Sequence, residues 1–153
     1  LTACAYYRAH GIAEIDKTPE PIKVISGRHQ NPSGCWSFEA VFTKQAQPDF
    51  QGTIDGGRSV VFEAKATDKD RILQSAVTEE QAHAMQSHAQ KGALVFVLVC
   101  LRRRAVYRVP WEVWWRMRQH FGHKYMTAKE LEPYRVQMRR GVILFLGDPG
   151  EDA

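Results

Sequence analysis

Residues 93–101 constrain the fold most, because apolar side chains occupy nearly the whole stretch. A run of this length and composition is typical of a strand that is buried on both faces of a sheet. Helices must then cover the sheet, so the run predicts an α/β architecture. It is the longest apolar run of the chain, and it is much shorter than the roughly 18 residues of a membrane span. We therefore expect no membrane segment.

Two further strands are predicted upstream, at residues 49–54 and 58–66. The intervening residues 55–57 read Asp-Gly-Gly, which favours a tight turn between antiparallel strands. The two strands are therefore expected to pair as a hairpin.

A helix is predicted between this hairpin and the buried strand. Thr78 is a suitable N-cap, Gln81 occupies the capping-box position three residues later, and Gly92 is placed to end the helix. The order of hairpin, helix and strand predicts a mixed β-sheet core flanked by helices.

Residues 26–47 form a long excursion between core elements and follow a short alternating strand at residues 22–25. The first part is rich in Gly, Pro, Asn and Ser, and long excursions in small domains are usually functional or disordered. The chain has 153 residues, the size of one ordinary domain. We expect one domain over residues 1–153, with an insertion at about 26–47.

The last third of the chain is expected to add a helix and a strand. Pro110 can open the helix as its first residue, and Trp111, Trp114 and Trp115 follow at helical spacing. Such tryptophans usually pack in the core, although an exposed one can stack on a base or bury at a dimer interface. A late strand is predicted at residues 142–146.

The net charge of +4 is distributed unevenly. Residues 101–140 contain eleven Lys or Arg and three acids, a balance of +8, which leaves −4 for the rest of the chain. A basic surface beside an acid-containing region suits a polyanionic partner and a nearby metal site. A solvated basic face without a partner is the alternative interpretation.

Cys4, Cys35 and Cys100 form no CxxC pair. An odd number of scattered cysteines favours neither disulfides nor a structural zinc site. We expect these side chains to pack as small apolar groups in a reducing cytoplasm, that of a bacterial cell or a phage-infected host.

Asp49, Glu63 and Lys65 are the candidate catalytic residues. Side chains alternate along a strand, so Glu63 and Lys65 project from one face, and the hairpin brings Asp49 to the same patch. Hard Mg²⁺ is held by one or two carboxylates together with waters and phosphate oxygens. A lysine beside them can orient or deprotonate a water, or offset charge on the phosphorus. Gln81, on the first turn of the next helix, is placed to bind that water or Lys65.

The stretch Phe62-Glu63-Ala64-Lys65, followed by Thr67, resembles the signature of RecU-type Holliday junction resolvases, which belong to the PD-(D/E)xK nuclease superfamily. Short matches follow in the same order over about two thirds of the chain, at residues 7–8, 11–13, 17–22, 48–52, 81–85 and 93–99. The resemblance implies a restriction-endonuclease-like fold with a protruding stalk between core strands, here about residues 26–47.

By this resemblance Asp49 and Glu63 are metal ligands, Lys65 is the catalytic lysine and Gln81 is the helix glutamine of the superfamily. The implied cofactor is Mg²⁺, which Mn²⁺ replaces. The implied reaction is cleavage of four-way junction DNA by a homodimer whose two active sites nick opposed strands. Members of the family also carry an acidic residue in a first helix, and by this resemblance its counterpart would lie upstream of Leu1.

The stalk would enter the centre of the junction, with Phe38 or Phe42 as packing or wedge residues. Basic turns elsewhere would contact phosphates, although mere solvation of the arginines between residues 102 and 104 is an equally good interpretation. The candidate DNA-binding residues are Arg28, His29, Lys44, Thr67, Arg102, Arg103 and Arg104.

Two other functions fit the same residues. The chain can be another nuclease of this fold, such as a nickase or a sequence-specific endonuclease, which only substrate preference would distinguish. It can also be a DNA-junction-binding protein without catalysis. The structural alternative for the site itself is an exposed Glu63–Lys65 pair, worth at most about 1 kcal/mol.

Overall fold

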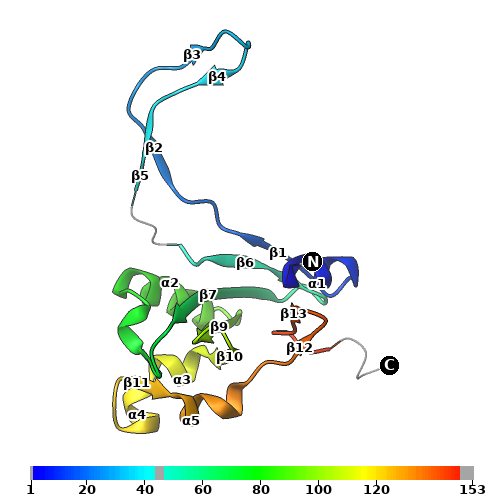
Figure 1. The fold of residues 1–153 in the computed structure, drawn as a ribbon, viewed down its shortest axis with the longest axis vertical. Coiled ribbons are helices and arrows are strands. Elements are labelled where there is room, and N and C mark those ends of the chain that lie inside the picture. Colours follow the sequence, from blue (N-terminus) through cyan, green and yellow to red (C-terminus); the bar gives the residue numbers. More distant parts are fainter. Residues whose placement is uncertain (1, 44–46, 149–153) are drawn as a thin grey trace.

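A computed structural model describes residues 2–43 and 47–148. Its core is one five-stranded sheet in the order β1-β6-β7-β9-β10 (Figure 1). Strands β7 and β9 are parallel, and the other neighbours are antiparallel. The sheet strands are β1 (Ala13–Lys17), β6 (Phe50–Ile54), β7 (Ser59–Thr67), β9 (Leu94–Leu101) and β10 (Ala105–Pro110). The predicted α/β class, the mixed sheet and the hairpin are confirmed.

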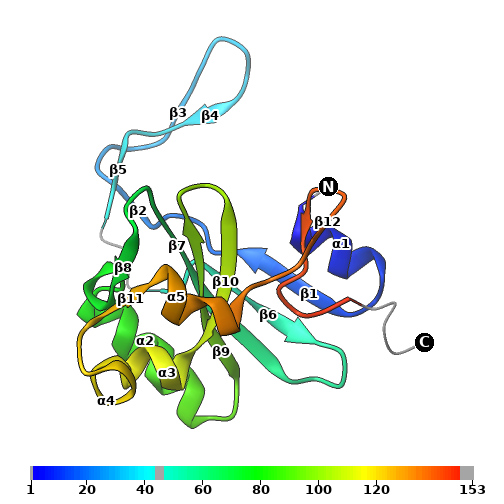
Figure 2. The same ribbon diagram turned by 60° about the horizontal axis from the view of Figure 1, so that its bottom comes forward.

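Helices lie on both faces of the sheet, and short elements complete the chain (Figures 1 and 2). The helices are α1 (Ala3–Ala9), α2 (Glu79–Gln90), α3 (Trp111–Trp115), α4 (Met117–Phe121) and α5 (Ala128–Leu131), with 3-10 turns at Gln74–Ala76 and Glu132–Tyr134. Two small ribbons pair β8 (Arg71–Leu73) with β11 (Tyr125–Thr127) and β12 (Met138–Arg139) with β13 (Val142–Ile143).

A stalk projects from the sheet between β1 and β6 (Figure 1). Its two arms pair at the base as β2 (Ile22–Val24) with β5 (Ala40–Phe42), and near the tip as β3 (His29–Gln30) with β4 (Trp36–Ser37). The strand expected at residues 22–25 is therefore one arm of the stalk, and the paired arms begin at Ile22.

One face of the sheet is packed with aromatic rings. The rings of Phe50, Phe62 and Phe96 stack across three strands with centroids 4.7 Å apart at each step. Phe145 lies 5.0 Å from Phe62, and Tyr7 of α1 packs against Phe145. This cluster fixes the backbone of β6, β7 and β9 from one side.

The other face packs against α2 and α3. The core between this face and the two helices includes Val61 and Val97 of the sheet, Met85 of α2, and Trp111 and Trp114 of α3. Alternation along β7 therefore sends Phe62 to one core and Val61 to the other. Core packing of the tryptophans is confirmed for Trp111 and Trp114 but wrong for Trp115, which is 43% exposed.

Two boundaries in the last third differ from the prediction. The strand expected at residues 142–146 ends at Ile143 and lies outside the central sheet, because Phe145 leaves the ribbon to pack against the stacked phenylalanines. Pro110 ends β10 and precedes the helix, which begins at Trp111. Among the described residues no helix is long and apolar enough to cross a membrane.

Gly52 is required where β1 and β6 meet. A Cβ built at this position would lie 2.7 Å from Ile15 Cα and would also clash with the carbonyl oxygen of Glu14. We expect Gly52→Ala to push β1 away and to lower the free energy of unfolding by about 2 kcal/mol or more. Gly27→Ala, where a Cβ meets nothing within 4 Å, is the matched control. Urea denaturation that finds the two variants equally stable would contradict this packing.

Candidate active site

The β6–β7 hairpin brings Asp49 and Glu63 together. Phe50 pairs with Phe62, so Asp49, which directly precedes β6, lies opposite Glu63. The Asp49 Oδ2 atom accepts a hydrogen bond from the backbone N–H of Ala64 at 3.0 Å, and the backbone N–H of Asp49 donates to Glu63 Oε1 at 3.2 Å. These two bonds lock the aspartate to the strand that carries the glutamate.

Glu63 is fully buried, with 0% of its surface exposed. A buried carboxyl group is costly unless hydrogen-bond donors surround it. The Glu63 Oε2 atom receives hydrogen bonds from Lys65 Nζ and from Gln81 Nε2, each at 3.0 Å. Together with the Asp49 amide, three donors surround this carboxyl group. Its alternative interpretation as part of an exposed edge pair is therefore wrong.

Gln81 joins the site to the start of α2. The helix begins with a capping box in which Thr78 and Gln81 satisfy each other's backbone N–H groups, as predicted. The Gln81 Oε1 atom accepts from Thr78 N at 3.1 Å and from Lys65 Nζ at 3.2 Å. One side chain thus caps the helix and orients both the lysine and the glutamate.

Burial raises the pKa of Glu63 to about 7, and the neighbouring Asp49 carboxylate adds to the rise. The hydrogen bond and the positive charge of Lys65 oppose this rise of the pKa without cancelling it. The carboxyl groups of Asp49 and Glu63 have one lysine beside them, so further positive charge would stabilise their ionised forms. A divalent cation would supply it.

The residues fit a hard divalent cation. Among the described residues no group of three His, Cys, Asp or Glu side chains is arranged to hold a metal. Mg²⁺ does not need such a group, since one or two carboxylates with waters and substrate phosphates are its usual protein site. Asp49 and Glu63 are the two carboxylates that would hold it.

The turn Arg102–Arg104 joins β9 to β10 and lies beside the C-terminal end of β7. Arg102 N donates to the Thr67 carbonyl at 2.7 Å, and Arg103 forms an exposed ion pair with Asp68 at 3.6 Å. Arg102 and Arg103 both adopt positive φ angles, of 52° and 53°. Both angles belong to the tight turn between β9 and β10, a hairpin geometry that requires positive φ at its central residues.

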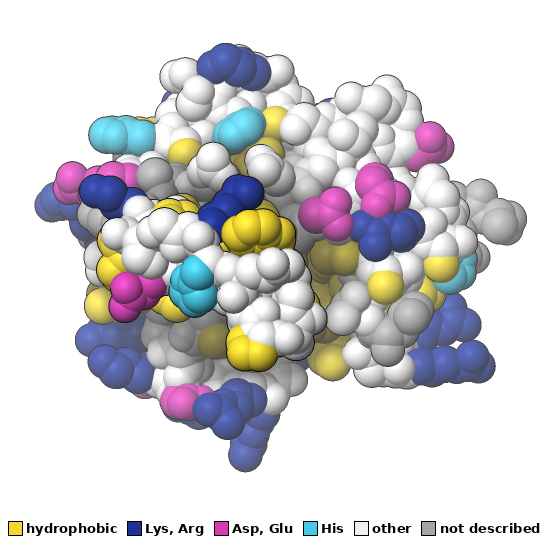
Figure 3. Space-filling model, turned by 90° about the horizontal axis from the view of Figure 1, so that it is seen from above, with side chains coloured by type: hydrophobic (Ala, Val, Ile, Leu, Met, Phe, Trp, Pro, Cys, Tyr) yellow, Lys and Arg dark blue, Asp and Glu magenta, His cyan; other side chains and the backbone are white. Residues whose placement is uncertain are grey.

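The stalk residues lie apart from this cluster. Arg28 and His29 are exposed near the tip of the stalk, away from the sheet (Figure 1), and Lys44 lies outside the described residues. Seen down the stalk, Lys and Arg side chains lie around much of the periphery of the molecule (Figure 3). Within one chain, Arg28 and His29 therefore lie apart from Asp49, Glu63, Lys65 and Gln81.

Sequence reasoning missed the most exposed aromatic side chain near the stalk tip. Trp36 is 67% exposed, whereas Phe38 is 42% and Phe42 is 76% exposed, the last of them near the base. A tryptophan inside a polar excursion was the available signal, but pairing in the stalk decides which aromatic stands near the tip.

The excess of basic residues between 101 and 140 is partly neutralised inside the molecule. Arg135 pairs with Glu132, Arg139 pairs with Asp148, and Arg108 donates to the Phe145 carbonyl. Of these contacts only the ion pair of Arg139 with Asp148 lowers the balance of +8, because Glu132 is already counted in it.

Comparison with known protein families matches residues 2–146 to Recombination protein U, or RecU. The chain belongs to the RecU family. Relatives described as Holliday junction resolvase RecU occur in Geobacillus sp. WCH70, Listeria innocua and Staphylococcus saprophyticus. They are 30%, 29% and 31% identical over 84%, 90% and 88% of this chain. The matches span 66%, 71% and 69% of the relatives, so the chain covers about two thirds of their length.

A solved structure shares the fold of this RecU family member. Hjc, a Holliday junction resolvase from Archaeoglobus fulgidus, superimposes with a TM-score of 0.50 over 84% of this chain and 85% of its own. The two sequences are 12% identical, so this likeness concerns the fold. It confirms the nuclease-like α/β core that the sequence predicted.

The raised pKa of Glu63 predicts how stability depends on pH without metal. Between pH 4.5, the ordinary carboxyl value, and about 7, the folded protein holds a proton that the unfolded chain releases. The free energy of unfolding therefore falls as pH rises through this window, by about 2–3 kcal/mol for Glu63 alone. In Glu63→Gln this pH-dependent decrease in the free energy of unfolding should be absent.

Urea denaturation in EDTA at pH 5 and pH 8 measures the effect. Glu39→Gln, at an exposed stalk position, removes the same charge and serves as the control. If wild type, Glu63→Gln and Glu39→Gln change equally between the two pH values, Glu63 does not carry the raised pKa.

Proposed function

We propose that this protein is a metal-dependent endonuclease that resolves four-way DNA junctions. The observation that supports it best is the cluster of Asp49, Glu63, Lys65 and Gln81 at the base of a projecting stalk. The chain belongs to the RecU family, and curated members are named Holliday junction resolvases. Because the chain covers about two thirds of their length, the activity of the whole protein is part of the proposal.

The contacts of the four side chains suggest a role for each of them. Asp49 and Glu63 would hold Mg²⁺, with Mn²⁺ as a substitute, and the ion supplies a polarised phosphate and an activated water. Lys65 donates to Glu63 and Gln81, which leaves a third N–H of its ammonium for a phosphate oxygen or the attacking water. Gln81 holds the lysine in that direction.

Resolution of a junction needs two cuts on opposed strands. One chain carries one such cluster, so paired nicks require two copies related by a twofold axis. We therefore propose a homodimer, which presents two active sites and two stalks to one junction. The exposed Arg28, His29 and Trp36 would meet the DNA where its strands exchange, and the turn at Arg102–Arg104 would contact phosphates nearer the cut. The free cysteines fit a reducing cytoplasm, that of a bacterial cell or a phage-infected host.

Cleavage of a labelled four-way junction tests the proposal, with a duplex of matched sequence beside it. We expect Mg²⁺-dependent nicks near the branch point, reduced roughly a hundredfold or more by Asp49→Asn because the ion loses a ligand. Junction binding should stay the same or tighten, since a carboxylate near phosphate is removed. Asp55→Asn, in the turn at the other end of the same hairpin, is the matched control and should cut normally.

Each other outcome has a distinct meaning. Equal cutting of duplex and junction would retain the nuclease and reject junction specificity. Tight junction binding without cleavage at any Mg²⁺ or Mn²⁺ concentration would favour a junction-binding protein. Normal cleavage by Asp49→Asn would remove Asp49 from the site.

A further inference from the structure

Thr18 has a buried hydroxyl group without a hydrogen-bond partner. The residue is 5% exposed, and its Oγ1 is the one buried side-chain polar atom in the described ranges for which no partner is found. Burying a hydroxyl without a partner costs free energy, so such an atom in a native protein calls for an explanation.

The register of the sheet, continued by one residue, places Thr18 next to Asp49 in the row that ends at Glu63. Lys17 pairs with Phe50 and Phe50 pairs with Phe62, so the next residues along this row are Thr18, Asp49 and Glu63. The backbone N–H of Thr18 donates to the carbonyl of Asp49 at 2.8 Å. Neighbouring residues in such a row project from the same face of a sheet. The hydroxyl therefore belongs to the face that carries the site.

We infer that Thr18 contributes a third, neutral oxygen to the divalent-cation site formed by Asp49 and Glu63. The inference rests on the proposed metal dependence of the enzyme. Hard cations bind hydroxyl as well as carboxylate oxygens, and Mg²⁺ sites that use Ser or Thr beside a carboxylate are common in proteins. A neutral oxygen also suits this position, because the two carboxyl groups already repel each other.

Two substitutions separate this role from simple packing. Thr18→Val replaces the hydroxyl by a methyl group of similar size, whereas Thr18→Ser keeps the oxygen. We expect Thr18→Val to weaken Mn²⁺ binding roughly tenfold or more in the absence of DNA. The same variant should unfold at a higher temperature without metal, since the unsatisfied group is gone. Thr18→Ser should bind Mn²⁺ much as the wild type does.

Isothermal titration of Mn²⁺ into the full chain and melting in EDTA provide both readouts, with Asp49→Asn as the reference for loss of the site. Mn²⁺ affinity of Thr18→Val equal to that of the wild type would overturn the inference. So would a lower melting temperature of Thr18→Val without metal, which assigns the hydroxyl to folding. If Asp49→Asn binds Mn²⁺ as well as wild type, the proposed metal site itself fails.

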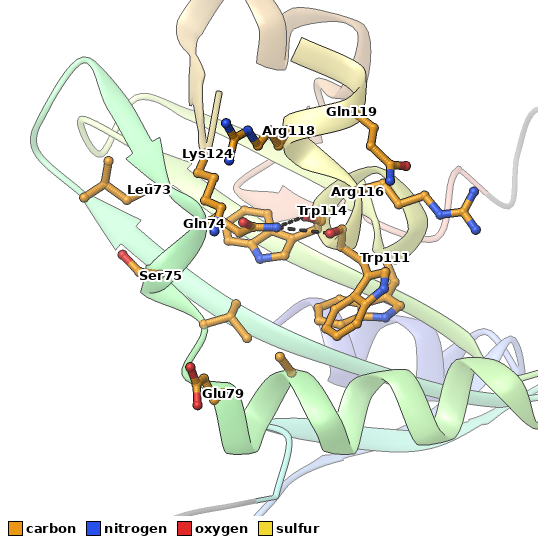
Figure 4. Close-up of a pocket in the computed structure, with 13 residues that line it drawn as sticks. Leu73, Gln74, Ser75, Glu79, Trp111, Trp114, Arg116, Arg118, Gln119 and Lys124 are labelled. Carbon is orange, nitrogen blue, oxygen red and sulfur yellow. Dashed lines mark hydrogen bonds between the residues drawn. The ribbon is translucent and has the colours of Figure 1, made fainter. Parts of the chain in front are cut away.

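A second site lies in a groove of about 830 Å³ between α2, α3, α4 and the turn at Gln74–Ala76 (Figure 4). The carboxamide of Gln74 donates to the carbonyls of Trp114 and Trp115 at 2.8 and 3.2 Å, which fixes one wall. The volume is that of a ligand pocket, and Asp49, Glu63 and Lys65 do not line it. The groove is therefore separate from the proposed active site.

Its lining accepts an apolar side chain better than a stacked base. Trp111 and Trp114 are only 3% and 1% exposed, so their ring faces are covered by the protein. Apart from Trp115, the remaining apolar lining is aliphatic and includes Leu73 and Val77. Base stacking requires an open ring face, which only Trp115 offers.

The basic side chains of the groove stand on one side. Arg116, Arg118 and Lys124 stand on the side of α4, and Glu79 stands at the start of α2 (Figure 4). Arg116 pairs with Glu112 at 3.5 Å, whereas Arg118 and Lys124 form no ion pair within residues 2–43 and 47–148. Two free cations beside an apolar floor are complementary to carboxylates that flank a bulky apolar group.

We propose that this groove binds a short acidic segment of a partner protein, anchored by one bulky apolar side chain. The probe is a fluorescein-labelled peptide of Asp, Glu and Ser with a central Phe-Leu pair. The matched probe carries Ser in place of that pair, and labelled oligothymidine represents single-stranded DNA. Anisotropy with the full chain should show binding of the first probe alone, weakening as salt rises.

Variants locate the binding. Lys124→Glu and Leu73→Ser should each weaken peptide affinity several-fold to roughly tenfold. Lys91→Glu changes a lysine that does not line the groove and should not weaken it. Cleavage by these variants should be unchanged. Peptide binding that ignores Lys124 and Leu73, or no binding at low salt, would overturn the proposal. Binding of oligothymidine that both groove variants abolish would replace the protein partner by DNA.

Discussion

The buried carboxyl group of Glu63 is the constraint on which the rest of the site depends. A charged group inside a sheet is tolerated only when donors surround it, and here they come from three different elements. Asp49 precedes β6, Lys65 lies on β7, and Gln81 lies in the first turn of α2. Satisfying one side chain therefore fixes the hairpin register, the lysine rotamer and the start of the helix together.

The two faces of β7 divide the work between packing and chemistry. On one face Phe62 stands between Phe50 and Phe96 in a continuous stack, and on the other Glu63 and Lys65 meet α2. Close-packed rings resist displacement, so the strand is a rigid base for the charged groups. Functional side chains on such a base keep their geometry better than side chains on loops do.

Local chemistry made the core and the clustering of Asp49, Glu63, Lys65 and Gln81 predictable from sequence. Turn residues set the hairpin, and the capping box placed Gln81 at the first turn of α2. Thr18 was not predictable, because its position follows from pairing between residues far apart in the chain. The strand expected at residues 142–146 failed for a similar reason: Phe145 gains more from the ring cluster than from continuing a two-stranded ribbon. Burial of Trp114 but not Trp115 likewise depends on the tertiary packing of a short helix.

The site stands where the stalk leaves the sheet, and this position links recognition to chemistry. Thr18 lies where the chain leaves β1 for the stalk, and Asp49 lies where it returns to β6. The backbone N–H of Thr18 donates to the carbonyl of Asp49 and clamps the two segments together. Just beyond this clamp, Thr43 binds Pro21 through both its N–H and its hydroxyl, which joins the two arms at their base. An isolated two-stranded ribbon is only marginally stable, so any partner that tilts the stalk would act on these bonds first. Because Asp49 is part of the clamp, a change in the angle of the stalk is a change in the position of a proposed metal ligand. The proposed recognition of the junction by the stalk therefore has a short physical route to the proposed active site.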